Sequence, residues 1–485
     1  MSKSRIEDTA RSFLAGNMSR RAFIARMSRL GVGAAASAGV LSAVANRAWA
    51  QDFNWRKHAG KTIKVLLPKH PYATYLTQIL PAFTELTGIR VEHDTLPEGP
   101  FFEKKTSELN TRSATYDAFM DGIMFAWGEL LAGQIADLNE FIGDPGATSP
   151  AYNWEGILPN MRASCAWSGI PGDRLGGPGS RQMLVPLGWE GYCVSYNREI
   201  FDAAGVTPPE NLPAMRETSA KIKRDVGGSV HGISVRGAAN WGTIHPGYLS
   251  GFTSYGGQDF RAENGKIRAS MNSPQGKKFT QLWIDMVRES GPPKWTEYIW
   301  YEVGQDLGAG VAGMIFDADI LGFFQNTDEN NPAAGKIAFA PFAANPAANG
   351  NPKSNLWVWS LGMNNYSANK EAAWFWIQYN TMPQQLLAGV RDNGSLIDPV
   401  RGSIWNDAGF IKRLQDDYPG YLNQYEKTVG ECQVYFTAHP LFAQSADKWS
   451  RKLHEIYARQ VTADEGLDQL AEEINADLNR AGYLL

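Results

Sequence analysis

The sequence predicts an exported α/β protein built around a parallel β-sheet. Three features support this: a basic and then apolar leader over residues 1–50, a strand–helix–strand unit soon after it, and later strands that alternate with amphipathic helices. Such alternation favours a parallel sheet, because a helix usually forms the crossover between parallel strands. The 485 residues are enough for two or three domains of ordinary size.

The leader carries an adjacent arginine pair, Arg20 and Arg21, ahead of an apolar run and small residues at 48–50. This order is typical of a twin-arginine export signal, with a mature chain that begins at Gln51 in the periplasm. The alternative is an arginine pair on an ordinary helix whose apolar run packs in a core. Residues 30–45 form a shorter run than the ~20 residues that a membrane span needs, so we expect no stable anchor.

Charge and composition narrow the function classes. Residues 1–50 have a net charge of +6 and the whole chain −4, so the mature chain is near −10. An acidic chain argues against nucleic-acid binding and against a polybasic membrane-surface protein. The 7 histidines and 3 cysteines show no metal-ligand spacing, so we expect no metal and no cofactor. One disulfide among the cysteines is possible. The 16 tryptophans indicate a large core or a cleft that stacks flat apolar faces, such as sugar rings.

The mature chain begins with the strand–helix–strand unit. Residues 61–67 have the pattern of a buried strand, residues 72–86 repeat apolar side chains at helical spacing, and residues 89–92 start the next strand. Gly88 stands where a glycine commonly ends a helix. The elements that continue the pattern are a strand over 116–125, a helix over 128–138 and a strand over 185–196.

Three segments organise the C-terminal part. Residues 369–379 predict an amphipathic helix, and residues 445–478 predict two helices, the second beginning near Thr462. Residues 326–355 are rich in Asn, Pro and Ala, which predicts a loop over most of their length except residues 336–342.

Four stretches, taken in order, resemble the family 1 extracellular solute-binding proteins of ABC importers. They are the run FTELTGI at 83–89, residues 117–141 with GQIADL, the run SYNREIF at 195–201, and residues 361–373 with NKEAA. Together with the terminal helix they span nearly all of the mature chain. The resemblance implies a two-lobed, type II-like periplasmic binding protein fold with a hinge and a ligand in the interlobe cleft.

The resemblance also implies a division into lobes and a role. The N-terminal lobe would comprise residues 52–188 and 360–395, and the C-terminal lobe residues 192–355 and 400–485. The protein would be a monomer without enzymatic activity that binds a carbohydrate or polyol, closes, and delivers it to the transmembrane subunits of an ABC permease. Two alternatives stay open, namely a binder of an anionic solute such as glycerol phosphate and a secreted carbohydrate-active enzyme.

Residues just past strand ends are the candidates for the cleft, because α/β sheets bind ligands beyond the carboxyl ends of their strands. After the first strand these are Lys69, His70 and Tyr72, whose alternative role is to cap a helix. Farther on, Phe125 and Trp127 precede a helix, where they either contact the ligand or pack in the core.

Glu190 is the leading candidate, and Trp189 stands beside it. Counted back from the Tyr196-Asn197 motif, Glu190 falls where the family's maltose-binding member has a ligand-binding glutamate, at the first hinge crossing. A carboxylate accepts strong hydrogen bonds from hydroxyl groups. The alternative is an exposed hinge carboxylate.

The other candidates belong to the second lobe and to the later crossings. Asp317 and Asp319 follow a predicted strand and either bind hydroxyls or cap the next helix; as a pair with Glu190 they would also serve the enzyme alternative. The remaining candidates are Trp241 and His245 in a Gly-flanked loop, Trp357 and Trp359 on one face of the second crossing, and Arg391 near the third.

Overall fold

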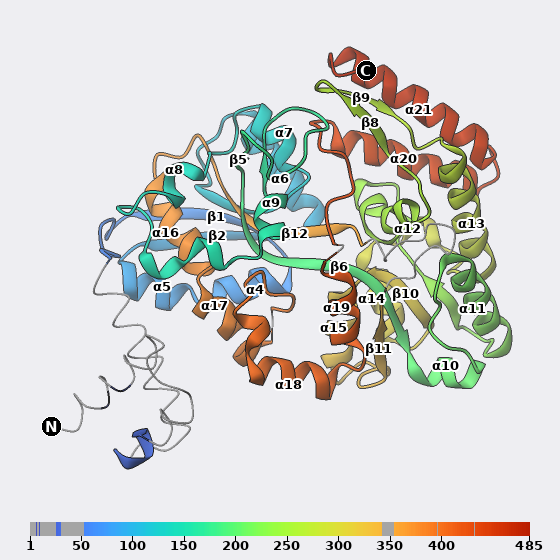
Figure 1. Ribbon diagram of the computed structural model, residues 1–485, viewed down its shortest axis with the longest axis horizontal. Helices are drawn as coiled ribbons and strands as arrows, with labels where there is room; N and C mark the ends of the chain where they lie inside the picture. Colours follow the sequence, from blue (N-terminus) through green and yellow to red (C-terminus); the bar gives the residue numbers. More distant parts are fainter. Residues whose placement is uncertain are drawn as a thin grey trace.

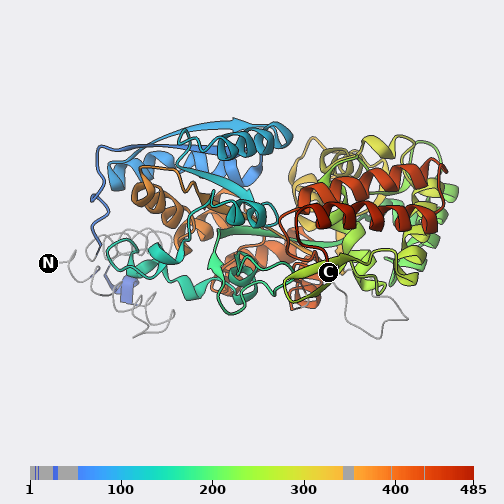
Figure 2. The ribbon, with the colours of Figure 1, turned by 90° about the horizontal axis from the view of Figure 1, so that it is seen from above.

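A computed structural model describes residues 53–341, 354–394, 396–430 and 432–485, together with residues 6, 9 and 26–30. The arginine pair of the predicted export signal lies outside the described residues. The chain forms two lobes that lie side by side (Figures 1 and 2). Among the described helices, none is both long enough and apolar enough to cross a membrane.

One eight-stranded sheet runs through both lobes in the order β2-β1-β3-β12-β6-β10-β7, with β11 also paired to β6. Its strands are β1 (Thr62–Pro68), β2 (Arg90–Leu96), β3 (Ala118–Gly122), β6 (Val185–Asn197), β7 (His231–Ser234), β10 (Ala312–Ala318), β11 (Ile337–Ala340) and β12 (Leu356–Met363). The pairs β1–β2, β1–β3 and β10–β7 are parallel. Strands β12 and β6 are antiparallel to each other and to their outer neighbours.

Strand β6 joins the two lobes (Figure 1). Its first half, up to Gly191, pairs with β12, and its second half, from Tyr192, pairs with β10 and β11 in the other lobe. A third segment passes beside this join, where Pro399 forms a bridge with Gly188. The predicted lobe boundaries stay a prediction, although two of them fall within β6 and β12.

The helices of the first lobe cover the sheet formed by β1, β2 and β3 (Figure 1). They are α4 (Pro71–Gln78), α5 (Leu80–Thr87), α6 (Glu98–Asn110), α7 (Ala126–Leu131), α8 (Asn139–Ile142), α9 (Pro159–Ser164), α16 (Lys370–Asn380) and α17 (Pro383–Ala388). The single helix predicted over 72–86 is two helices, because Pro81 has no N–H for a continuous ladder and the chain bends at Ile79. Gly88 ends α5 with φ 72°, as predicted.

The later helices pack around β7, β10 and β11, and some of them lie below the join in the view of Figure 1. They are α10 (Arg198–Ala204), α11 (Leu212–Asp225), α12 (Leu249–Ser254), α13 (Pro274–Ser290), α14 (Trp300–Gly308), α15 (Asp319–Thr327), α18 (Ala408–Asp417), α19 (Tyr421–Thr428), α20 (Phe442–Tyr457) and α21 (Ala463–Arg480). Helices α20 and α21 are the predicted C-terminal pair. The Thr462 side chain caps α21 by accepting from the Glu465 N–H at 3.1 Å.

Gly122, the last residue of β3, leaves room for the Trp357 side chain of the neighbouring strand β12. A Cβ atom at this position would lie 2.1 Å from Cζ2 and 2.2 Å from Cη2 of Trp357, which is buried. We expect Gly122→Ala to displace the indole and to lower the free energy of unfolding by about 1–3 kcal/mol, as overpacking does. Urea unfolding measures this change.

Gly430→Ala is the matched control, because a Cβ atom there meets nothing within 4 Å. Equal stability of the two variants would contradict the close approach of β3 and Trp357.

Candidate functional site

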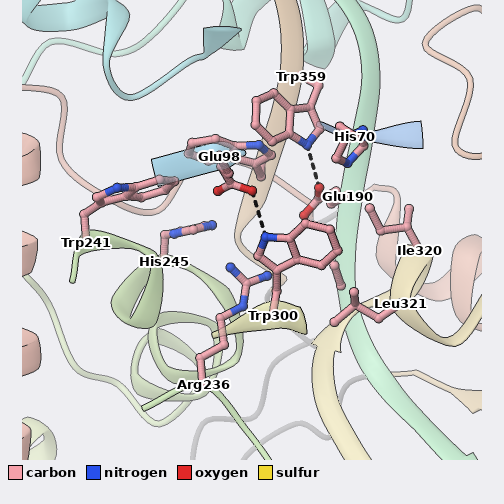
Figure 3. A pocket seen from close by; sticks show the side chains of 12 residues that line it. His70, Glu98, Glu190, Arg236, Trp241, His245, Trp300, Ile320, Leu321 and Trp359 are labelled. Carbon is pink, nitrogen blue, oxygen red and sulfur yellow. Dashed lines mark hydrogen bonds between the residues drawn. The ribbon is translucent and has the colours of Figure 1, made fainter. Parts of the chain in front are cut away.

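A small cavity lies where the two lobes meet (Figure 3). Its volume of about 20 Å³ is somewhat more than the roughly 10–15 Å³ that one water molecule needs. Residues from both lobes and from the join line it: His70, Glu98, Glu190, Arg236, Trp241, His245, Trp300, Ala318, Ile320, Leu321, Trp357 and Trp359.

The first lobe contributes residues that directly follow parallel strands. His70 follows β1 and caps α4, because its Nδ1 accepts a hydrogen bond from the Tyr72 N–H at 3.1 Å. Glu98 follows β2 and begins α6. Burial lowers the pKa of His70 to about 3, so its imidazole is neutral. Burial raises the pKa of Glu98, against the opposing effect of Arg236.

The two strands of the join contribute a carboxyl group and two indoles. Trp357 and Trp359 alternate on β12 and therefore share one face, with ring centroids 5.4 Å apart. The Trp359 Nε1–H donates to Glu190 Oε1 at 2.8 Å. Glu190 is thereby held against β12 while its carboxyl group lines the cavity (Figure 3).

The second lobe contributes a guanidinium group that is already paired. Arg236, just after β7, donates from Nη2 to Asp317 Oδ1 at 2.7 Å and from Nε to Asp317 Oδ2 at 2.9 Å. Its Nη1 donates to the Gly242 carbonyl at 3.2 Å. Burial opposes the charge, but Asp317 outweighs it and raises the pKa of Arg236. Arg236 stays charged, and three of its five N–H groups hold it in place.

A side-chain hydrogen bond at the cavity joins the two lobes. The Trp300 Nε1–H, at the start of α14, donates to Glu98 Oε2, at the start of α6, at 2.7 Å (Figure 3). A larger groove of about 870 Å³ lies next to the cavity, and Glu98 and Trp300 line both. The bond therefore stands between the closed cavity and the groove.

Aromatic rings close another side of the cavity, and three of them, Phe102, Phe125 and Trp241, also line the groove. The indole of Trp241 stacks on His245 and on Trp357, with both pairs of centroids 5.3 Å apart. Phe102 and Phe125 of the first lobe meet the same indole edge-on at 5.2 and 4.9 Å. Trp241 thus holds the lobes against each other.

Three ionisable groups of the cavity, His70, Glu190 and His245, are largely neutral at neutral pH. Burial raises the pKa of Glu190 to about 8, although Arg236 and the bond from Trp359 act against it, so at neutral pH the carboxyl is mostly protonated. Burial, and then Arg236, hold the pKa of His245 well below its ordinary value. A neutral imidazole offers one hydrogen-bond donor and one acceptor, and a protonated carboxyl can donate as well as accept.

The structure brings six of the predicted site residues together around the cavity: His70, Glu190, Trp241, His245, Trp357 and Trp359. Phe125 lines the adjoining groove, Tyr72 packs behind His70, and Asp317 stands behind Arg236. Whether any of these residues binds a ligand remains a prediction.

Four predicted residues lie away from the cavity. Trp189 alternates with Glu190 and packs against Tyr425 instead. The others are Trp127, which packs near Trp167, Asp319, whose Oδ1 accepts the Ile320 N–H at the start of its own helix, and Arg391, which pairs with Asp407 at the surface. Their part in ligand binding also stays a prediction.

The lining residues that sequence reasoning missed are Glu98, Arg236, Trp300, Ala318, Ile320 and Leu321. Glu98 and Arg236 follow β2 and β7, so the strand-end rule would have found them had the ends of those strands been located. Trp300 follows a loop rather than a strand, and its sequence carries no comparable signal.

Within the described ranges, no group of three or more His, Cys, Asp or Glu side chains is placed to hold a metal ion. Cys165, Cys193 and Cys432 are free thiols, and all three are buried. The disulfide that the cysteine count allowed is therefore not formed.

The chain matches the model of the bacterial extracellular solute-binding protein family over residues 68–385. It is 35% identical over 473 residues to the erythritol/L-threitol-binding protein of Mycolicibacterium smegmatis, covering 95% of this chain and 97% of that protein. Its fold resembles an ABC transporter solute-binding protein of Agrobacterium vitis with bound D-mannitol, with a TM-score of 0.72, 24% identity and coverage of 87% and 100%. One from Agrobacterium radiobacter, in complex with ribitol, gives a TM-score of 0.71, 19% identity and coverage of 86% and 98%.

Glu190 should make stability depend on pH. Its pKa is about 8 in the folded chain against an ordinary 4.5, so between these values the folded state binds more protons and the free energy of unfolding falls as pH rises. Glu190→Gln removes the titrating carboxyl group and therefore this fall in the free energy of unfolding. The stability of the variant relative to the wild type should therefore increase with pH across this window, by at most ~1.4 kcal/mol per pH unit.

Urea unfolding at several pH values within and outside the window measures the difference. Glu263→Gln, at an exposed position of the same charge, is the control. A difference between Glu190→Gln and wild type that does not change with pH would contradict the raised pKa.

Proposed function

Because this chain belongs to the family of bacterial extracellular solute-binding proteins, we propose that it binds a small neutral polyol and delivers it to an ABC permease. The supporting observation is the cavity itself, which is enclosed between two lobes and combines hydrogen-bonding groups with indole faces. Closure of such lobes around a solute is a common way to couple binding to a conformational signal.

The chemistry of the lining suits hydroxyl groups. Each hydroxyl both donates and accepts a hydrogen bond, and the cavity offers both roles through Glu98, Glu190 and the neutral ring of His245. Indole faces of Trp300 and Trp359 cover the apolar C–H surface that a polyol also presents. The cavity of about 20 Å³ holds little more than one water molecule, so the lobes must open to admit any polyol, and a short polyol needs less opening than an oligosaccharide.

Relatives point to the same ligand class. The Mycolicibacterium smegmatis protein is named for erythritol and L-threitol, and the two structural neighbours hold D-mannitol and ribitol. All four are acyclic polyols. We therefore place polyols ahead of cyclic sugars for this chain.

An anionic solute such as glycerol phosphate is less well supported. Arg236 is the lining residue with a fixed positive charge, and Asp317 already neutralises it. Glu98 would repel an anion whenever it is ionised. A charged ligand would therefore lose its hydration without gaining a free cation.

The enzyme alternative also lacks support from the geometry. It needs Glu190 to act with Asp317 or Asp319, but Asp317 is engaged with Arg236, and Asp319 does not line the cavity. We propose that the chain works as a monomeric carrier and catalyses no reaction.

The proposal predicts a ligand-dependent rise in melting temperature. Erythritol and other short polyols should stabilise the purified chain by mass action, and calorimetry should then give the Kd. Glu190→Ala removes a central hydrogen-bonding group, and Trp241→Ala removes the ring that bridges the lobes. Each should weaken binding at least ten-fold, about 1.4 kcal/mol, while the protein stays folded.

Glu263→Ala is the control, because Glu263 is exposed and lines neither the cavity nor the groove. Stabilisation by glycerol phosphate but by no polyol would replace the proposal with the anionic alternative. Turnover of oligosaccharides by the purified protein would contradict the carrier function.

We further propose a periplasmic location reached through the twin-arginine translocase. Extracellular function of the family supports export, and Arg20 and Arg21 suggest the route. Replacing both with lysine should leave full-length precursor in the cytoplasm, whereas the unchanged leader should yield a processed periplasmic form. Cell fractionation with immunoblotting measures the distribution, and normal export of the double variant would contradict the route.

A further inference from the structure

The cavity has one apolar end (Figure 3). Ile320 and Leu321, here called the end wall, lie on the side opposite Trp241 and His245. The Glu190 carboxyl lies between these two sides. A ligand that extends along the cavity therefore meets polar groups in the middle and hydrocarbon at the end wall.

The end wall is held firmly. It belongs to the first turn of α15, and both of its side chains are 3% exposed. The helix begins at Asp319, whose Oδ1 accepts the Ile320 N–H at 3.0 Å and whose Oδ2 accepts from Gln424 Nε2 at 3.0 Å. The Tyr421 hydroxyl lies within hydrogen-bond reach of both Asp319 and Asp398. These buried bonds tie the wall to α19 and to the third segment at the join.

The other sides leave a long ligand little room to move away. The stacked rings of His245, Trp241 and Trp357 close the far end. The bond between Glu98 and Trp300 closes the side toward the groove. A solute that the lobes close around is therefore confined in the direction that leads to the end wall.

We propose that the end wall limits the chain length of the bound polyol. The inference rests on the function proposed above, and it names the residues that would set specificity within that ligand class. A polyol carries a hydroxyl on every carbon, so a longer chain must press a hydroxyl against Ile320 and Leu321. Neither side chain can replace the hydrogen bonds that this hydroxyl loses on leaving water. A shorter polyol brings fewer hydroxyl groups toward the wall and therefore loses fewer of these hydrogen bonds.

The test compares chain lengths in defined variants. Calorimetry measures the Kd of erythritol, ribitol and D-mannitol for the wild type, Ile320→Ala, Leu321→Ala and Leu321→Ser. The wild type should bind erythritol at least ten-fold more tightly than D-mannitol. Removing wall atoms, or supplying a hydroxyl through Leu321→Ser, should reduce this ratio at least five-fold and leave the erythritol Kd within about three-fold.

Leu414→Ala is the matched control, because Leu414 is a buried leucine of α18 that does not line the cavity. It separates a change in selectivity from a general loss of stability. Thermal unfolding verifies that each variant folds, and Ile320→Ala decides the test if the Leu321 variants do not.

The outcomes distinguish the two levels of the proposal. Polyol binding with an unchanged ratio in all folded wall variants overturns the end wall as a length limit and leaves the carrier function intact. Equal affinity of the wild type for D-mannitol and erythritol also overturns the length limit and leaves the carrier function intact. Failure of the wild type to bind any of the three polyols overturns the proposed function and the length limit together.

Discussion

The pairing of β6 with β12 is the interaction on which the cavity depends. A buried backbone must find hydrogen-bond partners, and β6 satisfies its own by pairing with β12 in one half and with β10 and β11 in the other. One continuous strand therefore belongs to both lobes. Its register with β12 sets Glu190 opposite Trp357 and next to Trp359, at the point where the lobes meet.

The guanidinium and carboxyl groups of the site each have a partner that offsets the cost of leaving water. Arg236 has Asp317 as a bidentate partner, and Glu98 and Glu190 each accept a hydrogen bond from an indole N–H. An indole satisfies a carboxyl oxygen without adding charge, so the cavity keeps polar groups in a setting that disfavours ions. Such a lining discriminates by hydrogen bonding and shape more than by charge.

Much of the fold could be predicted from local patterns, but the site only in part. Apolar runs and capping residues indicated β1, α20 and α21, and the strand-end rule found His70. The alternation of Trp357 and Trp359 could be read from the sequence, and the same alternation places Trp189 and its neighbour Glu190 on opposite faces of β6, since neighbours on a strand face opposite ways. Arg236 was missed because the end of β7 was not located. The place of Trp300 depends on how two distant segments approach each other, which periodicity in one chain does not encode.

The hydrogen bond between Glu98 and Trp300 has a kinetic consequence. It joins the first turn of α6 to the first turn of α14 across the cleft, between the cavity and the groove. A solute that leaves between Glu98 and Trp300 must break this bond, whatever its own contacts inside. Part of the residence time is therefore common to all cargo. If the chain carries a solute as proposed, the closed carrier would keep a share of its dwell time that does not depend on which solute it holds.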